Sequence, residues 1–514
     1  MEIDIYSLDR VTTLLGLFLL AIGYHAISSV LAWRRLRAFP GPLFASFSYL
    51  WVIRASQTGH IHRTLLAEVD KHGTTTIRVG PNELLTGNPD VIRRITAARS
   101  RYRRSDWYRL HRLIPGQDSM LTTLDVAEHD WLKAKTAPGY TGKDVPSLEV
   151  TIDSVLLNLV SKLRAKYAAN PSLPRSGANV KPLLDLARTA SYFTLDSITQ
   201  LAFDQNFGFL DSETDVYGHL VMLDEMARKA MVFTTAPPFI GRIVSSTPFR
   251  RLVDFLVKPE NRAGIFRILP ITRAIVAKRY GPEAPRQNDM LGSFVAHGLS
   301  EAQANNEAVL QVMAGSDTTA TWIRATMLYI LSSPRVYRRL QDEIDAGVRN
   351  GMISSTVISS AEATALPYLQ AVLWEGLRIH PPASSMSFKV VPPEGDIIDG
   401  KFVPGGTRTG TMVEVAMRMK DVFGDDADVY RPERWLEADK EKEVEMRKTV
   451  DLVFSYGRYG CAGKLVAHME AAKVVVELLR SFNFQLAYPE KPWDSVNFAV
   501  FLQRNLWVAV SLRD

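Results

Sequence analysis

The chain has 514 residues but only one cysteine, Cys461. One cysteine cannot form an internal disulfide, so the folded part needs no oxidising compartment. A lone thiol without a second thiol or a His-spaced partner does not describe a zinc or iron–sulfur site, and no local signature supports a cysteine protease. The chain also lacks an N-glycosylation acceptor, because the one candidate, Asn170-Pro171-Ser172, has proline in the middle. These absences favour a body that faces the cytosol.

Residues 11–33 contain no Asp, Glu, Lys or Arg. At about 1.5 Å per residue, a helix of this length crosses the ~30 Å hydrocarbon core of a bilayer. Arg34, Arg35 and Arg37 follow at once, and this positive charge predicts that the C-terminal side is cytosolic. A cleaved signal peptide would need a basic start and a shorter apolar core, and a buried core helix is the third interpretation. We expect a lumenal N-terminus (1–10), a transmembrane anchor (11–33) and a basic, proline-rich hinge (34–44).

Residues 45–514 contain no evident linker, so we expect one large catalytic domain. β-Branched runs on both sides of Gly80-Pro81-Asn82 predict an early hairpin. Short apolar runs at 387–411 and 497–510 predict further strands, whereas most of the remaining sequence has a helical pattern. The expected fold class is therefore mainly α with small β-sheets (α+β).

One predicted helix is unusually long. Ser300 and Gln303 form a capping-box pattern, and the helical pattern then continues to Ser332, about thirty residues against a mean of about 11–12. Its middle, residues 314–320 (AGSDTTA), consists largely of poor helix formers. Close packing against a neighbouring helix would explain this. A local opening that exposes Asp317 and Thr318 to a ligand would explain it equally well.

Cys461 lies in a glycine-rich loop, FSYGRYGCAGK (454–464), directly before a predicted helix at 465–479. Glycines at 457, 460 and 463 allow tight turns and let backbone N–H groups approach the sulfur. The helix N-terminus adds partial positive charge. A thiolate in such a place needs a cation or a metal, and a haem held by one axial cysteine fits this requirement.

Two further patterns are weak by themselves. Glu375 and Arg378, in WEGLR, are three residues apart and meet on one helix face before His380-Pro381-Pro382 ends the helix. Arg434 belongs to YRPERW, residues 430–435. The order of these patterns, with the cysteine loop last, is what is specific.

In this order the chain resembles the microsomal cytochrome P-450 family of haem-thiolate monooxygenases. The resemblance covers nearly the whole chain and implies a single haem-enclosing domain that binds haem b. It implies Cys461 as the axial ligand of the iron, and Asp317 and Thr318 as the acid–alcohol pair that delivers protons during oxygen activation. It also implies a buried triad of Glu375, Arg378 and Arg434 that supports the haem. The other haem contacts that it suggests are His129, Lys133, Lys389, Phe454, Arg458 and Gly463.

The sequence departs from the family pattern around the haem propionates. The family usually has arginine two residues before the cysteine, but Tyr459 stands there and Arg458 precedes it. His129 and Lys133 align with the propionate-contacting pair, although Trp131 and Lys135 show the same spacing. Lys389 stands where an arginine is frequent, and lysine cannot give bidentate geometry.

The resemblance also implies partners and a location. Electrons would come from NADPH through a membrane reductase, with cytochrome b5 as an optional second donor, at the endoplasmic reticulum membrane with a single span. The sequence looks like the fungal group that includes pisatin demethylase, which predicts a lipophilic secondary metabolite (terpenoid, alkaloid or polyketide) as substrate. Segments expected around the substrate are 101–120, 222–240, 383–388 and 497–501.

Two other functions stay open at this point. One is a haem-binding sensor or carrier without turnover, and the other is a haem-thiolate isomerase or dehydratase that needs no reductase. Asp317 and Thr318 argue for the monooxygenase, because neither alternative needs a proton relay.

Overall fold

The computed structural model describes the chain except for residues 1–4, 115, 169–181, 236, 245, 247, 249–264, 282–286 and 514. Helices dominate it and four small sheets accompany them in the described part, which confirms the predicted fold class. The helices are α1 (Ile5–Arg35), η1 (Leu43–Ser46), α2 (Leu50–Gln57), α3 (Ile61–His72), α4 (Pro89–Thr96), η2 (Asp106–His111), α5 (Val126–Tyr140), α6 (Leu148–Lys162), η3 (Leu163–Tyr167), α7 (Leu186–Phe203), α8 (Phe209–Ser212), η4 (Val216–Gly218), α9 (His219–Thr235), α10 (Pro238–Val244), α12 (Ile265–Ala277), α13 (Met290–Ala296), α14 (Glu301–Leu331), α15 (Pro334–Arg349), α16 (Ser360–Thr364), α17 (Pro367–Ile379), α18 (Val413–Ala416), α19 (Lys420–Phe423), α20 (Arg434–Glu437), α21 (Lys440–Val450), η6 (Asp451–Phe454), η7 (Gly457–Tyr459) and α22 (Lys464–Ser481).

The strands are β1 (Thr76–Gly80), β2 (Glu83–Thr86), β3 (Arg103–Arg104), β4 (Leu184–Asp185), β5 (Ser385–Val390), β6 (Asp396–Ile398), β7 (Lys401–Val403), β8 (Arg408–Met412), β9 (Phe482–Leu486), β10 (Asp494–Asn497), β11 (Phe501–Arg504) and β12 (Trp507–Leu512). Strands lie in the three regions where the sequence predicted them, whereas β3, β4 and β9 lie outside those regions. The largest sheet has the order β1-β2-β8-β5-β3, and the predicted hairpin is its antiparallel pair β1–β2. The others are β4-β12-β9, β10-β11 and β6-β7.

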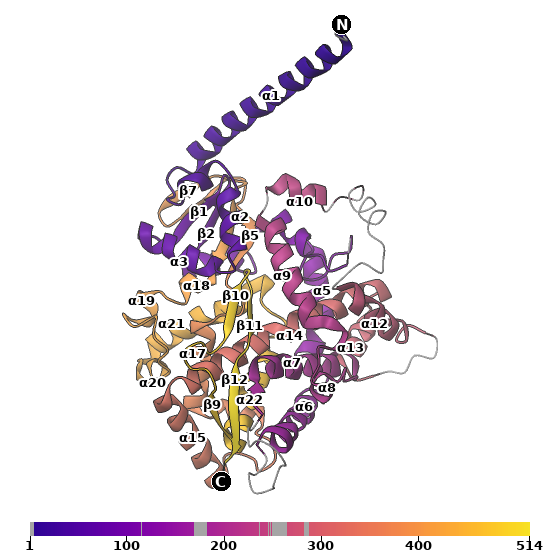
Figure 1. Ribbon diagram of the computed structural model, residues 1–514, viewed down its shortest axis with the longest axis vertical. Helices are drawn as coiled ribbons and strands as arrows, with labels where there is room; N and C mark the ends of the chain where they lie inside the picture. Colours follow the sequence, from indigo (N-terminus) through magenta and orange to yellow (C-terminus); the bar gives the residue numbers. More distant parts are fainter. Residues whose placement is uncertain are drawn as a thin grey trace.

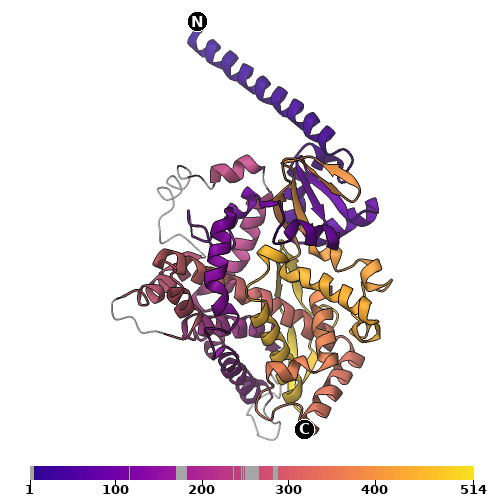
Figure 2. The ribbon, with the colours of Figure 1, turned by 180° about the vertical axis from the view of Figure 1, so that it is seen from behind.

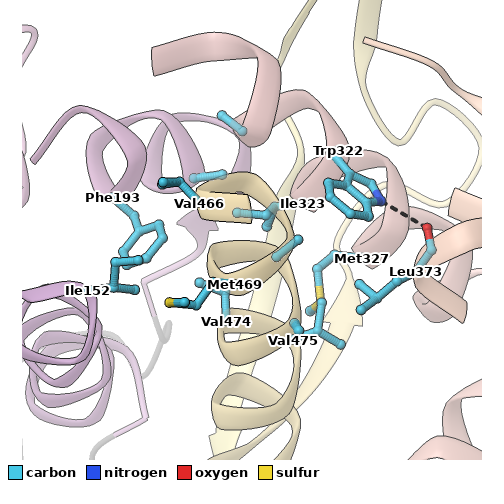
Figure 3. Packing of buried hydrophobic residues seen from close by; sticks show 14 of the residues in the cluster. Ile152, Phe193, Trp322, Ile323, Met327, Leu373, Val466, Met469, Val474 and Val475 are labelled. Carbon is cyan, nitrogen blue, oxygen red and sulfur yellow. Dashed lines mark hydrogen bonds between the residues drawn. The ribbon is translucent and has the colours of Figure 1, made fainter. Parts of the chain in front are cut away.

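Helix α14 runs through the middle of the body (Figure 1). It begins with the predicted capping box, because the Ser300 hydroxyl accepts from the Gln303 backbone N–H and the Gln303 side chain accepts from that of Ser300. It is continuous over 31 residues, and twenty-one of these are buried. Its main neighbours are α7, α17, α12 and α22. Figure 3 shows part of this core, where Trp322 of α14 donates its indole N–H to the Leu373 carbonyl of α17 at 2.9 Å.

Helix α1 projects away from the body, with the chain's N-terminus at its far tip (Figures 1 and 2). Leu19, Leu20, Ile27 and Leu31 are exposed on it. None of the helices, as far as their residues are described, is both long and apolar enough to traverse a membrane.

The segment expected to be a hinge is partly packed onto the body. Leu36 and Phe39 are 1% and 4% exposed and belong to a small core with β2 and α4 residues. The Arg78 backbone N–H donates to the Pro40 carbonyl at 2.8 Å. Gly41 is required beside this bond, because a Cβ there would lie 2.2 Å from the Arg78 carbonyl oxygen. The chain between α1 and η1 is therefore fixed by β1.

Candidate haem-binding site

The cysteine loop is shaped by short 3₁₀ turns and a helix start. The Cys461 backbone N–H donates to the Phe454 carbonyl at 2.8 Å, which joins η6 to the start of α22. Gly457 has φ of 66°, and a Cβ there would lie 2.6 Å from the Thr96 carbonyl oxygen, so only glycine fits. Phe454 packs its ring against Trp322 and His468, at centroid distances of 6.1 and 5.2 Å.

The environment of the Cys461 sulfur is mixed. Burial has the largest effect and raises the pKa of the thiol overall, although the Gly463 and Lys464 backbone N–H groups and the cations of Lys133 and Lys464 partly offset it. The residue is nevertheless exposed, so part of it borders free space. Metal ligation by cysteine requires the thiolate, so the donors around Sγ favour the form that binds iron.

A second place with free space is the middle of α14. Ala314 and Thr318 are exposed there, although most of the helix is buried. The Thr318 hydroxyl donates back to the Ala314 carbonyl at 2.9 Å, and the helix stays continuous, so the interpretation as a local opening of the backbone is wrong. Asp317 forms an ion pair with Arg324 at 2.5 Å.

Gly315 supports the other interpretation, close packing against a neighbouring helix. A Cβ at this position would lie 2.9 Å from the Ile198 side chain of α7. The Thr194 hydroxyl of α7 also donates to the Ser316 carbonyl. The weak helix formers of 314–320 therefore serve two purposes, since Gly315 and Ser316 allow close packing while Ala314 and Thr318 border the free space.

The structure brings Glu375, Arg378 and Arg434 together in one buried network. Arg378 forms a bidentate pair with Glu375, at 2.9 Å (Nε–Oε2) and 2.7 Å (Nη2–Oε1), and both side chains are fully buried. Arg434 reaches Oε1 of the same carboxylate at 3.0 Å. The two arginines also donate to the carbonyls of Met417, Phe423, Asp426, Ala427 and Val429. The network thus fixes the backbone of residues 417–429.

Several cations gather around Tyr459, next to the cysteine loop. The guanidinium of Arg104 lies 4.1 Å and the ammonium of Lys389 4.7 Å from the centre of the Tyr459 ring. The His129 ring lies 4.7 Å from it. Lys133 donates to the carbonyls of Arg458 and Gly460, at 2.7 and 2.9 Å. Arg458 itself pairs with Asp130.

This cluster is deficient in negative charge. Among the described residues, no carboxylate lies within ion-pair distance of Arg104 or Lys389, and the Arg104 Nε has no hydrogen-bond partner. Burial lowers the pKa of Lys389 to about 7, with a contribution from the nearby Arg104. Burial also lowers the pKa of His129 to about 3, helped by the surrounding cations. Buried cations need counter-charges, so the cluster fits the two propionates of a haem.

The geometry selects one of the two registers that the sequence left open on α5. His129 is 2% exposed and Lys133 contacts the cysteine loop. Trp131 is 40% exposed, and Lys135 lies over its ring at 5.8 Å. His129 and Lys133 therefore face the site.

Arg104 was missed by sequence reasoning. It lies next to two other arginines, Arg101 and Arg103, and nothing in the local sequence distinguishes it from them. The alternation of strand β3 buries Arg104 and exposes Arg103. Arg104 also donates to the carbonyls of Met120 and Thr123, at 2.8 and 3.2 Å.

The predicted substrate segments lie near one another. Ile114, Met222 and Val309 share a small core with Ile268 and Leu269, and Met226 and Met313 pack against it. Met231 is buried in another cluster, whereas the side chains of Phe233 and Phe239 lie outside the described residues. A hollow of about 510 Å³ opens between η2 and α10 and reaches Arg104.

Comparison with known proteins shows which family the chain belongs to. The family model for cytochrome P-450 matches residues 39–507. The chain belongs to the cytochrome P-450 family. It is 44% identical to cytochrome P-450 monooxygenase ABA1 of Pyricularia oryzae, over 97% of this chain and 96% of that protein. It is 39% identical to aba1 of Botryotinia fuckeliana (93% and 92% covered) and 36% identical to abl1 of Leptosphaeria maculans (92% and 84%).

Cytochromes P-450 bind haem b through an axial cysteine thiolate. The chain is therefore a haem-thiolate monooxygenase that oxidises a small molecule. This confirms the predicted enzyme class and cofactor.

Proposed function

We propose that Cys461 is the axial ligand and that the enzyme oxidises a lipophilic secondary metabolite of a fungus. The observation that carries the ligand assignment is that a family defined by a cysteine ligand is represented here by a chain with one cysteine. The relatives named above are fungal monooxygenases, which supports oxygenation over the sensor and isomerase alternatives.

The residues around Cys461 would hold the haem by distinct means. The Gly463 and Lys464 N–H groups stabilise the thiolate, and Lys133 fixes the loop by bonding two of its carbonyls. Arg104 and Lys389 would neutralise the propionates, with His129 and Arg458 beside them. When bound, haem supplies oxygen activation, and a thiolate ligand favours O–O cleavage by donating electron density.

Asp317 and Thr318 would deliver protons from α14. Oxygen activation consumes protons in sequence, and a hydroxyl backed by a carboxylate can provide them without flooding the site with water. The exposed hydroxyl of Thr318 beside the partly exposed carboxylate of Asp317 supports these roles.

The location and the electron supply that we propose are based on α1 and on the family. Its projecting helix and exposed leucines support a single-span anchor in the endoplasmic reticulum membrane, with Arg34 and Arg35 on the cytosolic side. The catalytic domain would then meet an NADPH-dependent reductase, and cytochrome b5 as an optional donor, in the plane of the same membrane. A membrane location also suits a substrate that partitions into lipid.

The test uses the full chain in phospholipid nanodiscs. After reduction and addition of carbon monoxide, the wild type should show the long-wavelength Soret band of a thiolate ligand, and Cys461→Ser should lose it. Thr318→Ala should keep the band. An unchanged band in Cys461→Ser would refute the ligand assignment.

Turnover is tested separately with NADPH and reductase. Lipophilic metabolites that shift the Soret band should stimulate oxygen uptake and yield oxygenated products. Binding without any oxygen uptake, in a protein that the reductase does reduce, would favour the sensor or the isomerase.

A further inference from the structure

Arg324 is a buried arginine whose charge has one partner. It is 2% exposed, and Asp317 is the sole carboxylate within ion-pair distance of it among the described residues. The two residues are seven apart on α14, so they lie two turns apart on the same face. Separating a buried arginine from its carboxylate leaves an uncompensated charge, so the pair resists opening.

The remaining donors of Arg324 fix its orientation. Its Nε donates to the Ala320 carbonyl at 3.1 Å, its Nη1 to the Gln503 carbonyl at 3.0 Å, and its Nη2 to the Thr321 hydroxyl at 3.1 Å. A planar guanidinium that is bonded on all sides cannot rotate freely. The Asp317 carboxylate, which it holds through Oδ1, is therefore fixed as well, and Oδ2 has no partner among the described residues.

Strand β11 holds the Arg324–Asp317 pair in place. Besides the bond from Arg324 to Gln503, the Thr321 hydroxyl donates to the Phe501 carbonyl at 3.4 Å. On its other side, the Gln503 amide bonds the ring of the buried His380 at 2.8 Å. The hairpin β10–β11 ends in a tip where Ala499 has φ of 64° and Val500 is exposed, within a segment expected near the substrate.

We propose that Arg324 is a positioning residue for oxygen activation, which clamps the carboxylate of Asp317 between α14 and β11 so that Oδ2 stays available for proton transfer. The proposal rests on the proton-delivery role proposed above for Asp317. Arg324 touches no substrate and acts only through Asp317. Loss of the clamp lets the carboxylate turn away, and proton delivery slows by about tenfold or more, since small misplacements of catalytic groups have effects of this size.

The experiment needs no identified substrate. Without one, the reduced enzyme passes electrons from NADPH to oxygen and releases either hydrogen peroxide (two electrons and two protons) or water (four electrons and four protons). Slow proton delivery favours peroxide. The ratio of NADPH consumed to oxygen consumed, together with the peroxide formed, therefore measures the relay in nanodiscs that contain the full chain and reductase.

Four variants decide the matter. Arg324→Gln should raise the peroxide-to-water ratio about tenfold per haem while keeping the thiolate Soret band, and Arg324→Lys should restore part of the difference because it keeps the charge. Asp317→Asn tests the relay itself. The matched control is Arg279→Gln, since Arg279 pairs with Asp289 at 2.6 Å in another buried pair, 7% and 4% exposed, remote in sequence from residues 317–324.

The outcomes are distinguishable. If Asp317→Asn leaves the ratio unchanged, the relay proposed for Asp317 is refuted. If Asp317→Asn raises the ratio but Arg324→Gln does not, the clamp alone is refuted. If Arg279→Gln raises the peroxide-to-water ratio as much as Arg324→Gln does, the clamp is also refuted, because the effect would then come from general destabilisation. If Arg324→Gln does not bind haem, Arg324→Lys provides the test. A peroxide-to-water ratio equal to that of the wild type in Arg324→Lys would then refute the clamp.

Discussion

Lys389 illustrates how a single residue can report on the cofactor. It is 2% exposed on β5, close to Arg104, and both burial and this neighbour disfavour its charged form. With a pKa of about 7, roughly half of its amines are neutral at pH 7 when no anion is near. A propionate beside it would restore the charge.

Haem binding should therefore take up a proton at Lys389, and haem affinity should fall as the pH rises above about 7. Transfer of haem to apomyoglobin should be on the order of tenfold faster at pH 8.5 than at pH 6.5, the size expected for one linked proton. Lys389→Arg, which stays charged, and Lys389→Met, which has no charge, should both lose this pH dependence. An undiminished dependence in Lys389→Met would show that another group takes up the proton.

At the scale of one element, α17 shows why a weak sequence pattern can mark a critical position. The pair Glu375–Arg378 has the spacing of many surface pairs, which contribute a few tenths of a kcal/mol. Here the same spacing lies on the buried face of α17, and Arg434 from α20 joins it. The Glu375 carboxylate also accepts from the Trp435 indole and the Arg431 N–H, at 3.0 and 2.9 Å.

Glu375→Gln should destabilise the fold by about 3–5 kcal/mol, because the fully buried Arg378 would lose its counter-charge and Arg434 would keep only Asp426. Chemical denaturation followed by haem absorbance should reveal the loss, together with a lower haem content after purification. The control is Glu445→Gln on α21, which breaks an exposed pair of the same i, i+3 spacing, Lys442–Glu445. The free energy of unfolding of this control variant should differ from that of the wild type by no more than about 1 kcal/mol. Equal effects of both variants would contradict the importance of burial.

At the scale of the whole molecule, part of the segment that was expected to be a hinge is packed into the body. The body contains Leu36 and Phe39 in its core, and the Arg78 N–H bonds Pro40. By contrast, α1 contacts the body only through its last turns in the described part, for example where Arg78 donates to the Trp33 carbonyl.

Two truncations should separate anchoring from folding. Deletion of residues 2–33 should release the protein from membrane pellets and leave the thiolate Soret band intact. Deletion of residues 2–44 should also destabilise the body, because each buried side chain such as Leu36 or Phe39 contributes about 1.5–3 kcal/mol. Melting temperatures of the two purified forms provide the measurement. Equal melting temperatures would show that residues 34–44 are dispensable for the fold.

Much of the fold was predictable because its signals are local. The capping box at Ser300, the turn at residues 80–82 and the helix after the cysteine loop each depend on a few neighbouring residues, and the structure has all three. The role of residues 314–320 was not predictable in the same way. Whether a glycine opens a helix or admits a neighbour depends on α7, which is more than a hundred residues away in the sequence.

The sequence by itself determined the family and the cofactor, because these follow from residue types at fixed short spacings, and it offers one cysteine for the iron ligand that we propose. Only the tertiary structure decided which cations surround Tyr459, which register of α5 faces the loop, and what holds Asp317. Arg104 and Tyr459 are separated by more than 350 residues, and the clamp on Asp317 needs the backbone of β11. Such contacts depend on how buried charges find partners across the fold, and no local pattern encodes that choice.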